Sequence, residues 1–190
     1  MKENPIQPEP DYAEWHRRLQ DPATRRAAFA EVVSTYGERL YRLIRRMVIA
    51  HEDANDLLQN TFLKAWANLD YFRGEARIST WLYKIATNEC FTFLEKQRNR
   101  RHLSLDDADS YLIETLRSDD FFDGDALQTR FQMAILQLPP KQRLVFNLRY
   151  YNDMKYDDMS EALGTSTGAL KASYHHAVKK ISAAMTDSED

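Results

Sequence analysis

The sequence has very little cysteine, with Cys90 as the single example in 190 residues. One cysteine excludes a disulfide within the chain and a cysteine-based metal site, and it suits a reducing cytoplasm. No apolar run approaches the length of a membrane span. The first residues, MKENPIQPEPDY, contain no apolar stretch of the kind found in secretion signals. We therefore expect a cytoplasmic protein.

The sequence also lacks the marks of catalysis. It contains no glycine-rich phosphate-binding loop, no nucleophile elbow and no convincing metal triad. His51 lies next to Glu52 and Asp53, but no second histidine or cysteine stands at ligand spacing. We expect no enzymatic activity, no cofactor, no bound metal and no small-molecule substrate.

Charge is distributed unevenly beneath a formal net charge of −3. Residues 23–102 carry 14 basic and 9 acidic side chains, whereas residues 103–128 carry 1 and 8. The flanking residues 1–22 and 129–190 come to −2 and +1. A short acidic block thus separates two near-neutral or basic ones. Such a chain would bind DNA weakly alone, because phosphate neutralisation supplies most non-specific affinity.

Hydrophobic residues make up 43% of the chain, which is enough for a core, and they recur at helical spacing. The acidic block shows no sustained periodicity, and we expect at most a short helical turn there. The sequence predicts an all-α protein with an N-terminal helical bundle and a C-terminal four-helix, helix-turn-helix domain, joined by a flexible acidic linker. The expected divisions are a flexible tail at 1–22, the bundle at 23–101, the linker at 102–127, the second domain at 128–183 and a tail at 184–190.

Residues 71–101 combine aromatic, amide and cationic side chains. A helix is expected from about Trp81. One stripe of it, apart from its apolar face, holds Trp81, Lys84, Asn88 and Phe91 or Thr92. Aromatic rings for stacking, an amide for base edges and cations for phosphates suit single-stranded nucleic acid. The segment alone leaves open the alternative of an ordinary amphipathic helix with a solvated polar face.

The C-terminal block predicts a DNA-reading motif. A short helix is expected from about Tyr156 to Leu163, followed by a turn at Gly164 and a second helix capped by Ser166 or Thr167. Helix, glycine-containing turn and helix form the helix-turn-helix pattern, whose second helix enters the major groove. A plain helical hairpin is the alternative.

Three motifs in this order resemble those of the sigma-70 family of sigma factors, and specifically its extracytoplasmic function (ECF) group. HEDANDLLQNTFLKAWANL resembles the region that binds the clamp helices of the polymerase. FRGEARISTWLYKIATNECFTFL resembles the region that opens and reads the minus-ten promoter element. LPPKQRLVFNLRYYNDMKYDDMSEALGTSTGALKASYHHAVKKI resembles the domain that reads the minus-thirty-five element. The resemblance covers about residues 25–182.

The resemblance implies roles for individual residues. Contacts with minus-ten DNA are expected from Arg73, Gly74, Arg77, Thr80, Trp81, Lys84, Thr87, Asn88 and Arg98. Contacts with minus-thirty-five DNA are expected from Ser166, Thr167, Lys171, Ser173, Tyr174, His175 and His176. Polymerase contacts are expected from Asp53, Asp56, Leu57, Gln59, Asn60 and Phe62. Family members often carry arginine where this chain has Ser173 and His176, so the resemblance does not identify its upstream element, and weaker binding there is expected.

The function that the resemblance implies is that of a sigma factor. Its partners would be core RNA polymerase, promoter DNA and an anti-sigma factor, which in this group is often membrane-bound. It would direct promoter recognition, promoter melting and transcription initiation. The alternative is a free-standing helix-turn-helix transcriptional regulator, in which the N-terminal bundle serves as a sensor or for dimerisation. A helical scaffold without a role in DNA binding is a weaker third option, because the basic run and the capped helix argue against it.

Overall fold

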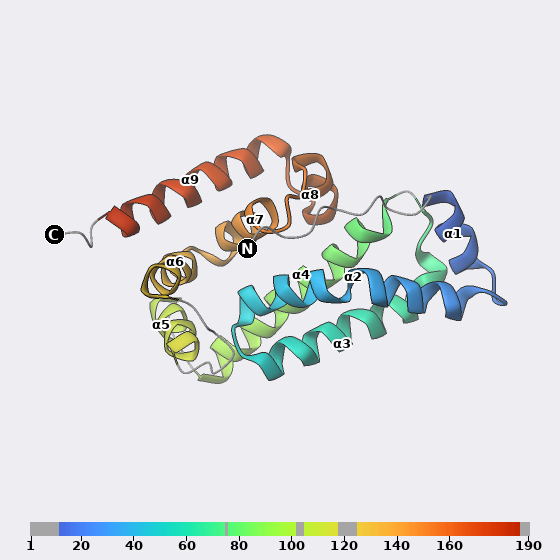
Figure 1. Cartoon of the computed structure of the whole chain (residues 1–190), viewed down its shortest axis with the longest axis horizontal. Coiled ribbons are helices and arrows are strands. Elements are labelled where there is room, and N and C mark those ends of the chain that lie inside the picture. The colour runs from blue at the N-terminus through green and yellow to red at the C-terminus, as the bar shows by residue number, and fades with distance from the viewer. Residues whose placement is uncertain (1–11, 75, 102–104, 118–124, 187–190) are drawn as a thin grey trace.

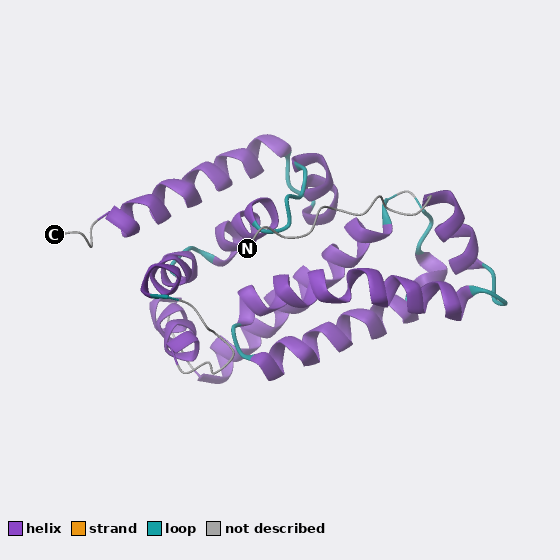
Figure 2. Cartoon of the chain, in the orientation of Figure 1, coloured by secondary structure: helices purple, strands orange, loops and turns teal. Residues whose placement is uncertain are grey.

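The computed structural model describes residues 12–74, 76–101, 105–117 and 125–186, and every regular element in these ranges is a helix (Figures 1 and 2). The all-α prediction is confirmed. None of the helices in this part of the chain is both long and apolar enough to cross a membrane. The elements are α1 (Tyr12–Gln20), α2 (Arg25–Val48), α3 (His51–Ala67), the short 3-10 helix η1 (Leu69–Tyr71), α4 (Ile78–Arg101), α5 (Leu105–Arg117), α6 (Ala126–Leu136), α7 (Pro140–Tyr150), α8 (Tyr156–Leu163) and α9 (Thr167–Thr186).

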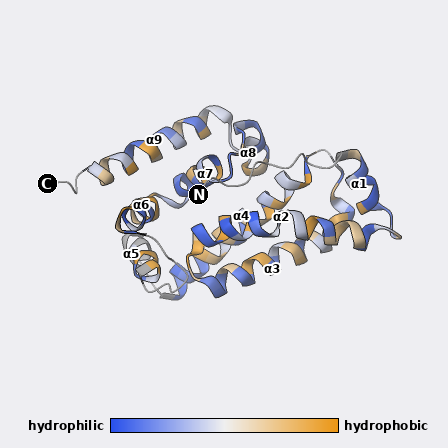
Figure 3. Ribbon diagram, viewed as in Figure 1, coloured by the Kyte–Doolittle hydropathy of each residue, from blue (hydrophilic) through white to orange (hydrophobic). Residues whose placement is uncertain are grey.

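The N-terminal half is a bundle of α2, α3 and α4, with α1 at one end of it (Figure 1). Apolar and polar residues alternate along these helices, as amphipathic packing requires (Figure 3). The buried face of α2 includes Val32, Leu40, Leu43, Ile44 and Met47, which repeat at steps of three and four. The expected apolar face of α4 is also found, with Leu82, Ala86 and Cys90 fully buried.

The C-terminal half contains the expected four helices, α6 to α9. Ile135, Leu138, Phe146, Ala177 and Ile181 form a core of their own between α6, α7 and α9. The observed bounds of α8 match the predicted ones, and α9 runs from Thr167 to Thr186. Ala177 of α9 is buried, whereas the neighbouring Val178 is partly exposed.

The prediction of a flexible tail at residues 1–22 is wrong for residues 12–20. Residues 12–20 form α1, and both Trp15 and Leu19 are buried in the bundle core. The ring of Trp15 meets that of Tyr36 edge-on at a centroid distance of 6.0 Å. Residues 1–11 and 187–190, which include parts of both expected tails, lie outside the described residues.

The expected linker at 102–127 also differs from its description. It contains the 13-residue helix α5, where at most a short turn was expected. Leu112 and Leu116, one turn apart, are buried against Ile49 and Leu136. Residues 102–104 and 118–124 lie outside the described ranges.

The buried face of α3 matches the predicted one in part. The apolar spacing predicts a buried face of Leu58, Phe62, Ala65, Trp66 and Leu69. Ala65 and Leu69 are buried and Leu58 and Phe62 are half-buried, but 43% of Trp66 is exposed, and the helix also buries Ala54, Leu57 and Thr61. Ala54, Thr61 and Ala65 are small, which lets α2 and α4 pack closely against α3. The larger side chain of Trp66 lies at the edge of that contact.

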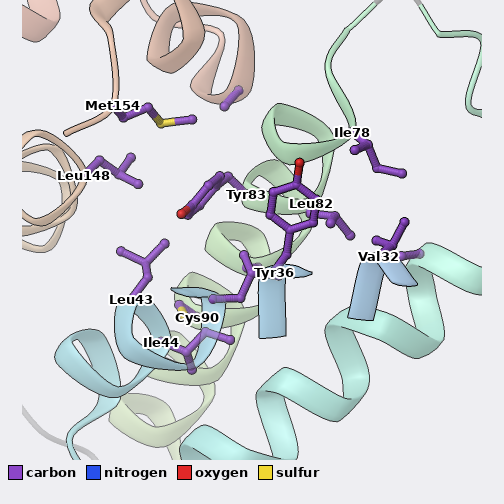
Figure 4. Close-up of a cluster of buried hydrophobic side chains, with 14 of the residues drawn as sticks. Val32, Tyr36, Leu43, Ile44, Ile78, Leu82, Tyr83, Cys90, Leu148 and Met154 are labelled. Carbon is purple, nitrogen blue, oxygen red and sulfur yellow. The ribbon is translucent and has the colours of Figure 1, made fainter. Parts of the chain in front are cut away.

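The two halves of the molecule pack against each other (Figure 4). Tyr83 of α4 lies beside Leu148 and Met154 of the C-terminal half, and all three belong to the core that also buries Leu43 and Tyr36. The core therefore continues from the N-terminal bundle into α7 and α8. The domain boundaries given above remain predictions.

Candidate nucleic-acid and polymerase interface

Phe72 and Gly74, which lie between α3 and α4, are closely packed against their neighbours. Phe72 is buried, and its ring lies 4.9 Å from the Trp81 ring, centroid to centroid, at an interplanar angle of 31°. Gly74 has φ +73°, in the left-handed region that side chains other than glycine rarely adopt. A Cβ atom at Gly74 would lie 2.6 Å from Cδ2 of His16. The sequence needs glycine here for both reasons.

The exposed stripe predicted on α4 is present. Lys84 and Asn88 are exposed one turn apart, and Trp81 is half-buried one turn before Lys84. Arg73 and Arg77, just before the helix, are exposed as well, whereas Arg98 is half-buried near its other end. The stripe places a ring, a cation and an amide along one face of α4, with two exposed arginines just before the helix, which is the chemistry that single strands require.

Two of the predicted minus-ten residues face the interior. Thr80 and Thr87 are each 2% exposed. The Thr87 hydroxyl donates to the carbonyl oxygen of Lys84 at 3.1 Å. Helix α4 begins at Ile78, so Thr80 lies inside the helix rather than ahead of it. In this arrangement neither threonine reaches the surface, and both support the stripe from beneath.

Some of the residues predicted to contact the polymerase are exposed, and others are half-buried or buried. Asp56, Gln59 and Asn60 are exposed, Asp53 and Phe62 are half-buried, and Leu57 is 6% exposed. Phe62 packs edge-on against Phe29 of α2, with centroids 6.3 Å apart. The exposed residues of this set share one side of α3.

The same side of α3 carries large apolar residues that the sequence reasoning did not include. Leu63 is 58% exposed, and Trp66 follows three residues later. Val33 of the neighbouring α2 is also partly exposed. Apolar side chains beside polar ones on an open surface are typical of protein contacts. The signal that could have found Trp66 is its spacing: it follows Gln59 by seven residues and Leu63 by three, which puts all three on one side of the helix.

His51, the residue weighed as a metal ligand, has two neighbours within hydrogen-bonding distance. Its Nδ1 lies 2.6 Å from the Tyr41 hydroxyl, and its Nε2 lies 2.9 Å from the side-chain amide nitrogen of Asn55. These contacts join the end of α2 to the start of α3. They give His51 a structural role.

The helix-turn-helix geometry follows from Gly164 and Ser166. Gly164 ends α8 in the left-handed conformation, with φ +61°. The Ser166 hydroxyl accepts a 3.3 Å hydrogen bond from the backbone N–H of Ala169, so Ser166 rather than Thr167 caps α9. Met159 and Ala162 of α8 and Leu170 of α9 are buried and hold the two helices together.

Most of the predicted minus-thirty-five residues lie at the surface of α9 or its cap. Ser166, Lys171, His175 and His176 are exposed, and Thr167 and Ser173 are half-buried. Tyr174 instead stacks on the buried ring of Phe146 at 5.8 Å and 14°. Burial raises the pKa of the Tyr174 hydroxyl above its ordinary value. Its ring packs toward the core of the C-terminal half.

Comparison with known proteins gives two family matches. The description Sigma-70 region 2 matches residues 32–100, and Sigma-70, region 4 matches residues 128–181. The ECF RNA polymerase sigma factor SigW of Bacillus subtilis (strain 168) is 31% identical over 156 residues, which are 78% of this chain and 83% of that protein.

Two solved structures share the fold. One is CnrH in complex with the cytosolic domain of CnrY, with a TM-score of 0.64 and 22% identity over 94% of this chain and 96% of that chain. The other is the sigma factor RpoE in complex with the anti-sigma factor NepR from Bartonella quintana, with a TM-score of 0.64 and 19% identity over 85% of this chain and 98% of that chain. The sequence matches establish more than the fold: the chain belongs to the ECF group of the sigma-70 family of RNA polymerase sigma factors.

Proposed function

We propose a division of labour along this sigma factor, in which α4 and the segment before it capture promoter bases, α3 binds the polymerase and α9 reads the upstream element. Membership in the family makes the protein a sigma factor, which binds core RNA polymerase and directs promoter recognition, promoter melting and transcription initiation. Each of these steps is assigned to one helix surface of the protein. Residues 23–101 and 128–183 are proposed as the two functional domains.

The observation that carries the proposal is the stripe of half-buried Trp81 and exposed Lys84 and Asn88, whose first ring packs on buried Phe72. Asn88 hydrogen-bonds an extruded base of the non-template strand, by the general chemistry of base flipping. The Trp81 ring offers a stacking surface, and Lys84, Arg73 and Arg77 neutralise phosphates. Thr80 and Thr87, being buried, contribute by holding the helix surface in place.

The energy of promoter opening explains why the polymerase is needed. Each base-pair step costs about 1.4 kcal/mol of stacking, so opening roughly ten steps costs on the order of 14 kcal/mol. A stacked base returns only about 1–3 kcal/mol. One stripe on one helix cannot supply the difference. The remaining DNA contacts come from the core enzyme, which favours a sigma factor over the free-standing regulator.

The polymerase surface is proposed on the outer side of α3. Asp56, Gln59 and Asn60 supply polar contacts there, with Asp53 and Phe62 at the edge. Exposed Leu63 and Trp66 extend this surface with apolar area. A polar and apolar mixture of this kind suits a stable protein–protein interface.

The upstream element is proposed to contact α9 through Lys171, His175 and His176, with Ser166, Thr167 and Ser173 near the phosphates. Tyr174 packs inward and supports this surface rather than reading bases. Because Ser173 and His176 replace arginines that are common in the family, we expect fewer guanine or phosphate contacts than is usual.

We further propose that an anti-sigma factor binds this chain, because the two structural neighbours are complexes with CnrY and with the anti-sigma factor NepR. The protein would act in the cytoplasm, where polymerase and DNA are found, and without enzymatic activity of its own. Transcription in vitro with core polymerase, followed by mapping of start sites, tests the proposed function. Start sites that appear only with the added chain are expected; footprinting of duplex DNA by the chain alone, with no effect on core polymerase, would support the regulator instead.

A further inference from the structure

The end of α1 and the start of α2 are both tied to residues between α3 and α4. The side-chain amide of Gln20 donates to the carbonyl oxygens of Leu69 and Phe72, at 3.0 and 2.9 Å. The carboxylate of Asp70 pairs with Arg25 at 2.7 Å. These contacts bridge about 50 positions of sequence, and they meet the stretch from which the promoter-reading surface begins.

His16 adds two contacts at the same point. Its Nε2 lies 3.2 Å from the carbonyl oxygen of Phe72, so this nitrogen carries the hydrogen and donates it. Its ring also lies 5.8 Å from the Phe72 ring. The Phe72 carbonyl therefore accepts from both His16 and Gln20, and Phe72 is held through its backbone and its ring at once.

Phe72 transmits this restraint to the surface. Its buried ring contacts the rings of both His16 and Trp81, at centroid distances of 5.8 and 4.9 Å. The His16 ring also fills the space next to Gly74, where a Cβ atom would stand only 2.6 Å from it. The positions of Gly74 and Trp81, both proposed to lie near promoter bases, thus depend on the same two side chains of α1.

We propose that α1 is a positioning element for promoter reading, in which His16 and Gln20 hold Phe72 and so fix Gly74 and Trp81 for base capture. The inference rests on the proposed function of the α4 surface. His16 and Gln20 are proposed as positioning residues, which do not themselves contact DNA. Without these two side chains, the base-capturing surface keeps the same residues, but Gly74 and Trp81 are no longer held in position.

The two side chains can be tested without removing the helix. Trp15 and Leu19 anchor α1 in the core, whereas His16 and Gln20 are half-buried. Gln20→Met keeps the length of the side chain and removes both donated hydrogen bonds. His16→Ala removes the ring and its donor, and His16→Gln restores a donor. Glu14→Gln, at an exposed position of the same helix, is the matched control.

The experiment uses the full chain with core polymerase on a mapped promoter. Opening is followed with a fluorescent base analogue in the minus-ten element, on the native promoter and on promoters with each base of that element replaced in turn. His16→Ala is expected to slow opening of the native duplex about fivefold, the factor for one lost hydrogen bond, and Gln20→Met, which removes two, at least as much. Both variants are also expected to lower the ratio of the opening rate on the native promoter to the opening rate on a replaced promoter. His16→Gln should restore part of the lost ratio of opening rates, and Glu14→Gln should leave that ratio unchanged.

The ratio separates positioning from stability, because a smaller folded fraction lowers opening on all promoters alike. An unchanged ratio in both Gln20→Met and His16→Ala, together with a reduced ratio in Asn88→Ala, overturns the role of α1 and leaves the proposed function standing. An unchanged ratio in Asn88→Ala as well overturns the proposed base-reading surface and the inference with it.

Discussion

The side-chain amide of Asn152, in the turn after α7, donates to the hydroxyl of Tyr83 on α4 at 3.1 Å. It is one of several polar contacts between the two halves of the protein. The Asn147 amide lies 3.6 Å from the sulfur of Met47, and the Arg46 guanidinium lies 3.7 Å from the centre of the Tyr151 ring. The helix-turn-helix half is thus docked on α2 and α4, with specific contacts rather than apolar burial alone.

Removal of the Tyr83–Asn152 contact is expected to weaken this docking. Tyr83→Phe and Asn152→Ala should each lower the free energy of unfolding by about 1 kcal/mol, because each removes one hydrogen bond in a partly buried setting. The double variant should cost less than the sum of the two, since both remove the same bond. Urea unfolding of the four proteins measures the coupling. Strictly additive losses would show that the two groups do not interact in solution.

Gly74→Ala is expected to destabilise the protein more than Gly164→Ala. Both glycines have positive φ, so each substitution carries a conformational cost of about 1–2 kcal/mol. Only Gly74 also faces a close neighbour, since a Cβ at Gly164 meets nothing within 4 Å. The excess should shrink in a His16→Ala background, where the clashing ring is absent. Thermal unfolding of the single and double variants checks this, and equal losses at both glycines would contradict it.

The thiol of Cys90 is expected to resist alkylation in the folded protein. Burial raises its pKa from 9.0 to about 12, with the nearby Glu89 carboxylate acting in the same direction. The thiolate is the reactive form, so labelling at pH 8 should be slow until the chain unfolds. Rapid labelling without loss of helical structure would contradict the buried position.

The same shift predicts a dependence of stability on alkaline pH. The folded state holds the Cys90 proton more tightly than the unfolded state, so its contribution is fully present below pH 9 and is lost as pH rises toward 12. In a Cys90→Ala variant this part of the decline should be absent. Urea unfolding of both proteins between pH 8 and 10.5 tests it, and parallel curves would exclude Cys90 as the cause.

Asp56→Arg combined with Gln59→Ala is expected to weaken binding to core polymerase, because both positions are exposed on the outer side of α3. Reversal of one charge at a close interface contact costs several kcal/mol. Glu161→Arg, an exposed reversal on α8, controls for net charge. Binding to immobilised core enzyme provides the measurement. Equal binding by both variants would move the polymerase contact away from this side of α3.

Some of the fold could be predicted from the sequence because the relevant signals are local. Gly164 and Ser166 mark the turn between α8 and α9, and the apolar spacing of Leu82, Ala86 and Cys90 marks the inner face of α4. Helix α1 was missed because its buried face is reduced to Trp15 and Leu19. Two apolar residues one turn apart in a polar segment are too few to establish a period.

The rest depends on tertiary contacts. The register of α3 is set by close approach at Ala54 and Ala65, which a preference for large buried residues does not detect. The exposed stripe of the candidate site was predicted from spacing on α4. Its support by His16 and Gln20 was not, because those residues lie more than 50 positions before Gly74. Contacts over such distances carry no periodic signal.

The most direct test of the account is promoter opening by Asn88→Ala with core polymerase. The variant should bind core enzyme normally and weaken opening by about 1–3 kcal/mol, the range for one lost base contact. Gln128→Ala, which removes an exposed amide on α6 outside the proposed contact surfaces, is the control and should behave as the unaltered protein. An unchanged yield of open complex with Asn88→Ala would contradict the assignment of base capture to this surface.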